Sequence, residues 1–270
     1  MVEGEVGRRL IRGGSAVPPG EWHLGWLVAC PILSVALLAS KFLPPFAGLW
    51  QRVDLAVFEL TNASLLSGNA WQWLWALTNH RAFDAVAGGF FLVIFLCYIV
   101  KARGRARVER FAAGGFLFAW TVIVLDVSSN WIFDFRHPSP TLVVVDAVRL
   151  SELVPQFKLK DSSGASFPGD HGTALIMFTV MIWFYAGRRP GLLAAAGASL
   201  FALPRLMSGA HWLSDIAVGS VSVALIALAL ALATPLHAVA VRWISWPLWK
   251  AIEWLMVKLS RPRGRSREET

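Results

Sequence analysis

The sequence predicts an all-α integral membrane protein with six transmembrane helices and further interfacial helices. The chain of 270 residues is 56% hydrophobic and only 16% charged, with a mean hydropathy of +0.56. Those values are typical of a protein that crosses the membrane several times. The 14 tryptophans fit the aromatic belts at membrane surfaces. The net charge of +8 would suit nucleic-acid binding only on a soluble basic face, so we expect no nucleic-acid partner.

Six apolar runs carry this prediction. The predicted spans cover residues 22–38, 85–100, 111–133, 172–186, 191–201 and 216–239. The first run follows a basic segment without an evident cleavage site, which favours a signal-anchor over a cleaved signal peptide. Tryptophan-rich stretches predict one or two interfacial helices within 44–84 and another within 242–258. We therefore divide the chain into a tail (1–21), a membrane domain (22–240), and an interfacial helix with a basic tail (241–270).

Basic residues predict the orientation. Six spans place both termini on one side of the membrane. The N-terminal tail, the 101–110 loop, the Arg188-Arg189 turn and the C-terminal tail carry 17 of the Lys and Arg residues, and the other face carries 8. By the positive-inside rule the first set is cytoplasmic, so both termini are expected there. The main polar clusters then fall on the outer face.

One of those clusters is the stretch Pro204-Arg-Leu-Met-Ser-Gly-Ala-His211-Trp-Leu-Ser-Asp215, with the spacing R-x5-H-x3-D. On a helix, His211 and Asp215 would share a face. A carboxylate there can accept one imidazole N–H and leave the other nitrogen free to attack. Arg205 adds a planar, permanently charged group that suits phosphate oxygens. The alternative is a helix-end histidine and aspartate that cap one another.

A second histidine, His171, lies at the start of another predicted span on the same face. Two imidazoles and a guanidinium at one membrane face predict phosphoryl transfer by a nucleophilic histidine, with the second imidazole as acid and base. We expect neither a metal site nor another cofactor, because no carboxylate cluster and no H-E-x-x-H motif is present. Cys30 and Cys97 both lie in apolar runs and suggest no metal site.

These residues resemble the type 2 phosphatidic acid phosphatase superfamily, whose motifs are K-x6-R-P, P-S-G-H and S-R-x5-H-x3-D. The third motif is matched except that Pro204 replaces its leading serine, and the second appears as Pro168-Gly-Asp-His171. The first is absent; Asn130-x6-His137-Pro138 keeps only its spacing. The resemblance implies that the six spans form the bundle of that superfamily.

These departures from the superfamily motifs resemble those of one branch, the bacterial lipid A 1-diphosphate synthases. The runs that carry this likeness are Leu77–Asp84, Ser139–Leu142, Arg149–Leu153, Ser166–Gly172 and Pro204–Ser220. The resemblance covers roughly residues 50–235. It implies a phosphotransferase of the bacterial inner membrane that moves a phosphoryl group from undecaprenyl diphosphate to the 1-phosphate of lipid A. Its active site would face the periplasm, among membrane lipids.

The resemblance also implies a role for each catalytic residue. His211 would be the nucleophile that forms a phosphohistidine, and Asp215 would orient it. His171 would protonate the departing undecaprenyl phosphate and then deprotonate the acceptor. Arg205 would bind the transferred phosphoryl group.

The missing first motif leaves too few cations around a pyrophosphate. We hypothesise that Arg136, Arg149 and Lys160 supply them from the long outer loop. Ser166, Gly169 and Asp170 are expected to line the substrate site as well. Asp170 either keeps His171 protonated, helps to bind a cation, or caps the following helix. The sequence leaves these three roles of Asp170 open.

Two other functions remain. A hydrolase of the same superfamily would use water as the acceptor and release inorganic phosphate. A lipid transporter would use the polar cluster to bind headgroups, but no pair of broken helices suggests inverted repeats. Analysis of the products distinguishes the hydrolase from the phosphotransferase. Lipid movement by a His211→Ala protein would favour the transporter.

Overall fold

The computed structural model describes residues 20–260, and within them the chain is helical. No β-strand occurs between these limits, where only two isolated bridges pair extended residues. The all-α prediction is therefore confirmed. Residues 1–19 of the predicted N-terminal tail and 261–270 of the basic C-terminal end lie outside the described residues.

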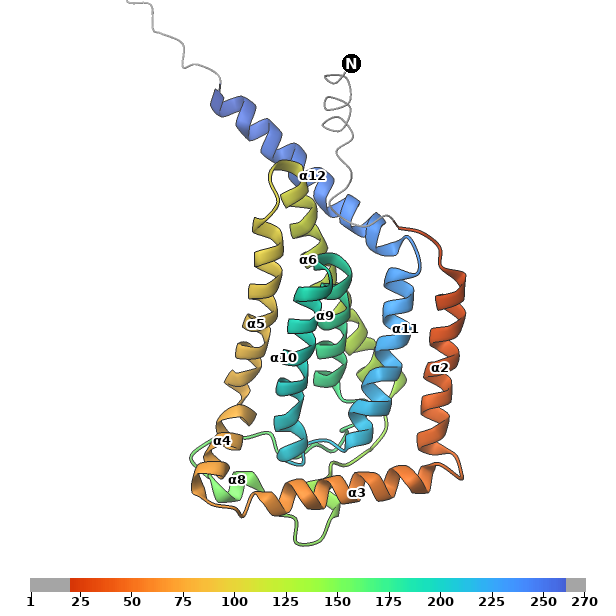
Figure 1. Ribbon diagram of the computed structural model, residues 1–270, viewed down its shortest axis with the longest axis vertical. Coiled ribbons are helices and arrows are strands. Elements are labelled where there is room, and N and C mark those ends of the chain that lie inside the picture. Colours follow the sequence, from red (N-terminus) through yellow and green to blue (C-terminus); the bar gives the residue numbers. More distant parts are fainter. Residues whose placement is uncertain (1–19, 261–270) are drawn as a thin grey trace, which may run out of the picture.

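Long helices run side by side along the molecule, and shorter ones cover one end (Figure 1). The long helices are α2 (Leu24–Phe42), α5 (Arg81–Val100), α6 (Gly104–Val127) with the π-helix η1 (Ser128–Ile132), α9 (Asp170–Ala186), α10 (Arg188–Met207), and the π-helix η2 (Asp215–Ser220) with α11 (Val221–Leu232). The remaining helices are α3 (Ala47–Ser64), α4 (Asn69–Asn79), α7 (Pro140–Val143), α8 (Leu150–Leu153) and α12 (Leu236–Ser260).

Each of the six predicted spans corresponds to one long helix. Five of them, α2, α5, α6 with η1, α10, and η2 with α11, are long and apolar enough to cross a membrane. The sixth, α9, has 17 residues, fewer than the roughly 20 of a typical span. The count of six therefore stays a prediction. The last span ends at Leu232, earlier than expected, because the Thr234-Pro235 break separates it from α12.

The tryptophan-rich segments form helices that cross the ends of the bundle. Figure 1 shows α3 lying across one end, nearly at right angles to the long helices, and α12 running obliquely across the other. The 44–84 stretch contains two helices at this end, α3 and α4, as expected. A helix that lies across the end of a bundle can place its tryptophans at the level of the headgroups. The arrangement supports the prediction of interfacial helices.

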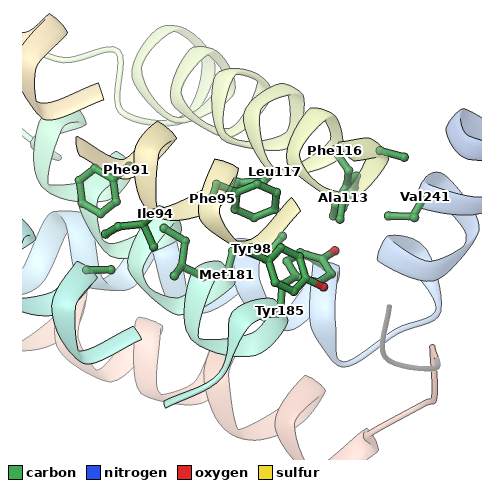
Figure 2. Packing of buried hydrophobic residues seen from close by; sticks show 14 of the residues in the cluster. Phe91, Ile94, Phe95, Tyr98, Ala113, Phe116, Leu117, Met181, Tyr185 and Val241 are labelled. Atoms are coloured by element: carbon green, nitrogen blue, oxygen red, sulfur yellow. The ribbon is translucent and has the colours of Figure 1, made fainter. Parts of the chain in front are cut away.

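The main hydrophobic core lies between α5, α6, α9 and α10 (Figure 2). Aromatic rings fill it: Phe91 stacks on Phe178, and Phe95 makes edge contacts with Tyr98 and Tyr185. Helix α10 approaches α5 closely, because a Cβ at Gly197 would lie only 2.2 Å from the Phe90 ring. Small residues allow such close approach in membrane bundles, where van der Waals packing drives helix association.

The long polar loop between η1 and α9 folds over the end of the bundle that α3 covers. Asn62 on α3 holds it through two hydrogen bonds with the Val148 backbone, of 2.7 and 2.9 Å. Asn79 at the end of α4 donates to the Lys160 carbonyl at 3.1 Å. A small apolar cluster, including Leu65 and Leu150, packs α8 against α4. These contacts fix the loop over the ends of α9 and α10.

Candidate active site

His211 does not lie on a helix. Helix α10 ends at Met207, η2 begins at Asp215, and His211 sits in the turn between them. The expected pairing still forms, because the turn brings His211 Nδ1 to 3.5 Å from Asp215 Oδ2. That oxygen also accepts a hydrogen bond from the Trp212 backbone N–H at 2.9 Å. The sequence therefore predicted the right pair through the wrong local structure.

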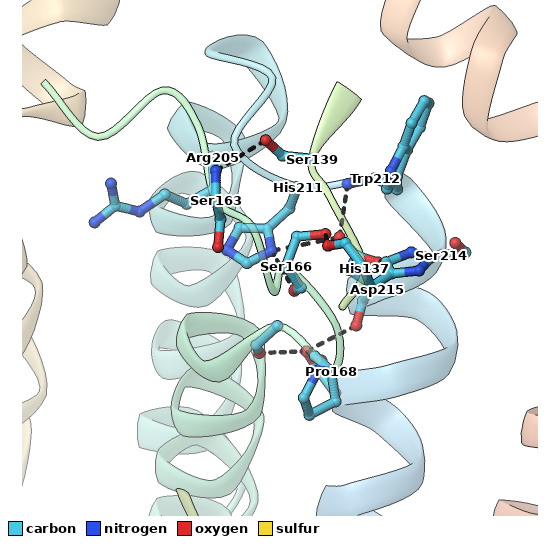
Figure 3. A network of polar contacts seen from close by, with 12 residues as sticks. His137, Ser139, Ser163, Ser166, Pro168, Arg205, His211, Trp212, Ser214 and Asp215 are labelled. Carbon is cyan, nitrogen blue, oxygen red and sulfur yellow. Dashed lines mark hydrogen bonds and ion pairs between the residues drawn. The ribbon is translucent and has the colours of Figure 1, made fainter. Parts of the chain in front are cut away.

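The histidine ring has a defined tautomer. Its Nδ1 lies 2.8 Å from the Ser166 carbonyl oxygen, which can only accept a hydrogen bond (Figure 3). Nδ1 therefore carries the proton, and Nε2 of the neutral ring holds the free lone pair. Asp215 is fully buried beside it and can compensate positive charge on the ring. This is the arrangement that a nucleophilic histidine requires.

A third histidine, His137, which we did not predict as a site residue, completes this network. His137 Nε2 lies 3.4 Å from Asp215 Oδ1, on the opposite oxygen from His211 (Figure 3). The His137 carbonyl accepts hydrogen bonds from the Ser166 backbone N–H at 2.7 Å and the Ser166 hydroxyl at 2.9 Å. His137, Ser166, His211 and Asp215 thus form a closed ring of contacts. The one signal in the sequence was the first-motif spacing that ends at His137-Pro138.

Arg205 links the site to α4 and α5. The residue is 4% exposed, and its guanidinium donates to Asn79 Oδ1 and to Asp84 Oδ1, both at 2.7 Å. Its Nη2 also lies 2.9 Å from His171 Nε2, which in turn is 3.3 Å from Asp84 Oδ2. Asn79 and Asp84 lie in the 77–84 run noted in the sequence, but neither was assigned a role.

Both predicted catalytic histidines line one small polar cavity. Its volume is about 70 Å³. Eleven residues line it: Ser129, Phe133, Asp134, Lys160, Ser163, Ala165, Ser166, Phe167, Asp170, His171 and His211. His171 comes from the first turn of α9 and His211 from the turn after α10, so two antiparallel helices bring them together. Both imidazoles therefore border the same polar cavity.

A buried ion pair supports the turn that carries the site. Lys41 Nζ at the end of α2 lies 2.8 Å from Asp54 Oδ2 on α3. Asp54 also accepts from the Ser214 N–H at 2.8 Å and the Ser214 hydroxyl at 2.6 Å. Since Ser214 directly precedes Asp215, the pair fixes the start of η2 and therefore the carboxylate that faces His211.

The comparisons with known proteins agree with this geometry. The model of the PAP2 superfamily matches residues 135–238, which hold His137, His171, Arg205, His211 and Asp215. The lipid A 1-diphosphate synthase of Escherichia coli (strain K12) is 38% identical over 214 residues, which cover 79% of this chain and 90% of that protein. The chain belongs to the PAP2 superfamily. No solved structure matches it. The predicted family, and the predicted likeness to a lipid A 1-diphosphate synthase, are both confirmed.

Only one of the three cations that we expected to replace the first PAP2 motif reaches the cavity. Lys160 lines it. Arg149 instead pairs with the buried Asp161 at 3.2 Å and donates to the Ser162 hydroxyl. Arg136 is exposed, and neither arginine is among the lining residues. Substrate binding by these three residues stays a prediction, and the structure favours Lys160.

The altered second PAP2 motif has a clear backbone function. Gly169 adopts φ +78°, and a Cβ there would lie 3.0 Å from the Asp215 carbonyl oxygen and 2.9 Å from Ser220 Oγ. Glycine therefore lets the start of α9 pack directly on η2. Asp170 in the first turn of α9 accepts a hydrogen bond from the Ser129 hydroxyl on η1. Its acidic side chain also suits a helix N-terminus.

No metal centre is evident in the described part of the chain. Between residues 20 and 260, no group of three or more His, Cys, Asp or Glu side chains is placed to hold a metal ion. The site that we can describe consists of imidazoles, a guanidinium, an ammonium group and orienting carboxylates.

Proposed function

We propose that this PAP2 enzyme transfers the terminal phosphoryl group of undecaprenyl diphosphate to the 1-phosphate of lipid A. The products are lipid A 1-diphosphate and undecaprenyl phosphate. The observation that carries the proposal is the shared cavity of His171 and His211, with the guanidinium of Arg205 on His171. The name of the relative, lipid A 1-diphosphate synthase, supplies the substrate class.

The first half-reaction forms a phosphohistidine. The lone pair on His211 Nε2 attacks the terminal phosphorus, and the bond from phosphorus to the bridging oxygen breaks. The bridging oxygen leaves with undecaprenyl phosphate and takes the proton of His171. Asp215, 3.5 Å from His211 Nδ1, compensates the positive charge that develops on the ring. Lys160, which lines the cavity, stabilises the oxygens of the phosphoryl group. Arg205 is not among the lining residues and acts on the group through His171, whose Nε2 lies 2.9 Å from its Nη2.

The second half-reaction reverses these roles. His171 takes a proton from the 1-phosphate of lipid A, whose oxygen then attacks the phosphohistidine. The phosphorus–nitrogen bond breaks and restores the lone pair of His211. His171 Nε2 has a partner in either protonation state: the protonated ring donates to Asp84 Oδ2, and the neutral ring accepts from Arg205 Nη2. A group held in both states suits an acid that later acts as a base.

We place the site on the periplasmic face of the inner membrane. The cavity lies at the end of the bundle covered by α3, while the basic 101–110 segment, which includes the start of α6, and Arg188-Arg189 at the start of α10 lie at the other end (Figure 1). The positive-inside rule assigns that basic end to the cytoplasm, together with both termini. ATP is scarce outside the cytoplasm, so a lipid diphosphate that carries its own activated phosphoryl group is a suitable donor.

Product analysis tests the proposal. Purified protein is given undecaprenyl diphosphate with a radioactive terminal phosphorus, with and without lipid A, and the products are separated. Label on lipid A that disappears in His211→Ala is the expected result. Inorganic phosphate in equal yield with or without lipid A would identify a hydrolase instead. The absence of any labelled product would contradict both enzymatic functions and favour a transporter.

A further inference from the structure

The histidine at the end of the lost first PAP2 motif, His137, faces the buried Asp215 and not the cavity. His137 is not among the residues that line the cavity, so its imidazole does not replace the arginine of that motif as a phosphate ligand. Its Nε2 instead lies 3.4 Å from Asp215 Oδ1. Within residues 20–260 neither of these two buried atoms has a hydrogen-bond partner, so each faces the other.

This contact matters because Asp215 is fully buried. Its Oδ2 faces His211 and accepts from Trp212, which leaves Oδ1 to His137. A buried carboxylate oxygen without a hydrogen-bond donor lowers the stability of the folded protein. It also destabilises the ionised carboxylate relative to its protonated form. That charge is what balances the ring of His211 when Nε2 bonds to phosphorus. His137 can therefore affect the nucleophile without touching the substrate.

We propose that His137 is a positioning residue that holds the Asp215 carboxylate toward His211. This inference rests on the proposed function. His137 acts on the nucleophile by two routes, since its backbone carbonyl also holds Ser166, whose own carbonyl accepts from His211. A substitution of the side chain removes one route and leaves the other intact.

The test uses three variants at this position. His137→Phe keeps the ring contacts with Phe135 and Phe167 but removes the donor. His137→Gln restores an N–H near the place of Nε2, and His137→Met has a similar length without a donor. We expect kcat of the Phe and Met variants to fall roughly 10- to 100-fold, the range found for residues that orient metal-bound histidines. KM should stay unchanged, because His137 lies outside the cavity. The Gln variant should recover most of the lost kcat.

The outcomes separate the two proposals. If the wild-type protein fails to transfer phosphoryl groups from undecaprenyl diphosphate, the proposed function is wrong. If the wild type is active but the Phe variant keeps its kcat, His137 has no positioning role. Equal losses in the Gln and Met variants would also overturn the inference, because they would indicate a packing role. The Gln and Met pair decides the question even if the Phe variant does not fold.

A separate observation concerns the opposite end of the bundle. A groove of about 640 Å³ lies between α5 and the α9–α10 turn, and three cations line it: Lys101, Arg188 and Arg189. No acidic residue is among its lining residues. Within residues 20–260, none of the three side chains has a hydrogen-bond or ion-pair partner. Two distant chain segments thus place three unpaired positive charges at one groove.

The rest of the groove is apolar. Val93 and Leu193, on α5 and α10, are more than half exposed along its walls, and Ile94 and Ala186 also line it. A positive mouth above apolar walls complements a phosphate headgroup attached to a hydrocarbon chain. Basic pockets between transmembrane helices on the cytoplasmic side bind anionic lipids in this way.

The geometry points to a binding site for one anionic phospholipid in this groove, apart from the active site. Native mass spectrometry with phosphatidylglycerol and phosphatidylcholine tests it. We expect the wild type to retain phosphatidylglycerol, and Arg188→Gln/Arg189→Gln to lose it. The control Arg103→Gln/Arg242→Gln removes equal charge from exposed residues outside the groove and should retain the lipid. Equal loss in the control, or equal retention of phosphatidylcholine by the wild type, would contradict a specific site.

Discussion

Arg205→Lys is the substitution that most directly probes the electrostatics of the site. The guanidinium makes three contacts at once, with Asn79, Asp84 and His171, at 2.7, 2.7 and 2.9 Å. A lysine keeps the charge but offers a single nitrogen, which cannot replace a planar fork. The variant therefore loses orientation while it keeps net charge.

The structure gives the expected magnitudes. A positioned general acid or base contributes roughly 10²- to 10⁴-fold, so the loss of the guanidinium that orients His171 should lower kcat by up to roughly 10²-fold. Asn79 is fully buried, so its amide oxygen loses a donor at a cost of about 1–3 kcal/mol in stability. Asp84 is 45% exposed and can turn to water, so its loss contributes only about 0–1 kcal/mol.

Steady-state transfer to lipid A, together with thermal unfolding in detergent, measures both effects. We expect a large fall in kcat and a modest fall in Tm. Arg52→Lys on α3 is the control, because that arginine is exposed at the same end of the bundle and is not among the partners of His171. If Arg205→Lys kept wild-type kcat, the positioning of His171 by Arg205 would have to be abandoned.

Three further predictions concern the second PAP2 motif and Ser166, which lies two residues before it. Gly169→Ala should lower the unfolding free energy by about 1–2 kcal/mol through the left-handed backbone alone. It should also lower activity, because the added Cβ moves α9 away from η2. Unchanged Tm and kcat would contradict the packing argument. Asp170→Asn keeps the contact with the Ser129 hydroxyl and removes a negative charge from the cavity, so KM should fall with an unchanged pH–rate profile. A shifted profile would show instead that Asp170 acts on His171. Ser166→Ala should retain kcat within about threefold, because the carbonyl that holds His211 and the 2.7 Å backbone hydrogen bond to His137 both remain. The variant loses only the hydrogen bond from the Ser166 hydroxyl to the His137 carbonyl, which contributes about 0.5–1.5 kcal/mol. A far larger loss would assign the hydroxyl itself to the substrate.

The sequence was sufficient for the parts of the site that local spacing controls. Arg205, His211 and Asp215 lie within eleven residues, so a single turn between two helices brings them together, whatever its detailed conformation. His171 followed from its place at the end of an apolar run on the same predicted face. Membrane helices are readable from composition alone, since their length and apolar character are set by the bilayer.

The partners of these residues could not be predicted in the same way. Arg205 meets Asn79 and Asp84 across 126 and 121 positions, and no periodicity in the chain reports such contacts. Asp215 meets His137 only because the long loop folds back over the bundle. Arg149 shows a related limit of charge patterns: its charge suggested a phosphate ligand, and in the folded loop it pairs with Asp161 at 3.2 Å, a contact that the sequence did not predict.

The central claim is that His211 carries the phosphoryl group during transfer. Donor with a radioactive terminal phosphorus is mixed with the wild-type protein in the absence of lipid A, and the reaction is quenched in alkali. We expect label on the protein that is stable in alkali, labile in acid, absent from His211→Ala, and transferred to lipid A when the acceptor is added. Formation of labelled lipid A without any labelled protein on the way, even at the shortest quench times, would contradict the phosphohistidine mechanism.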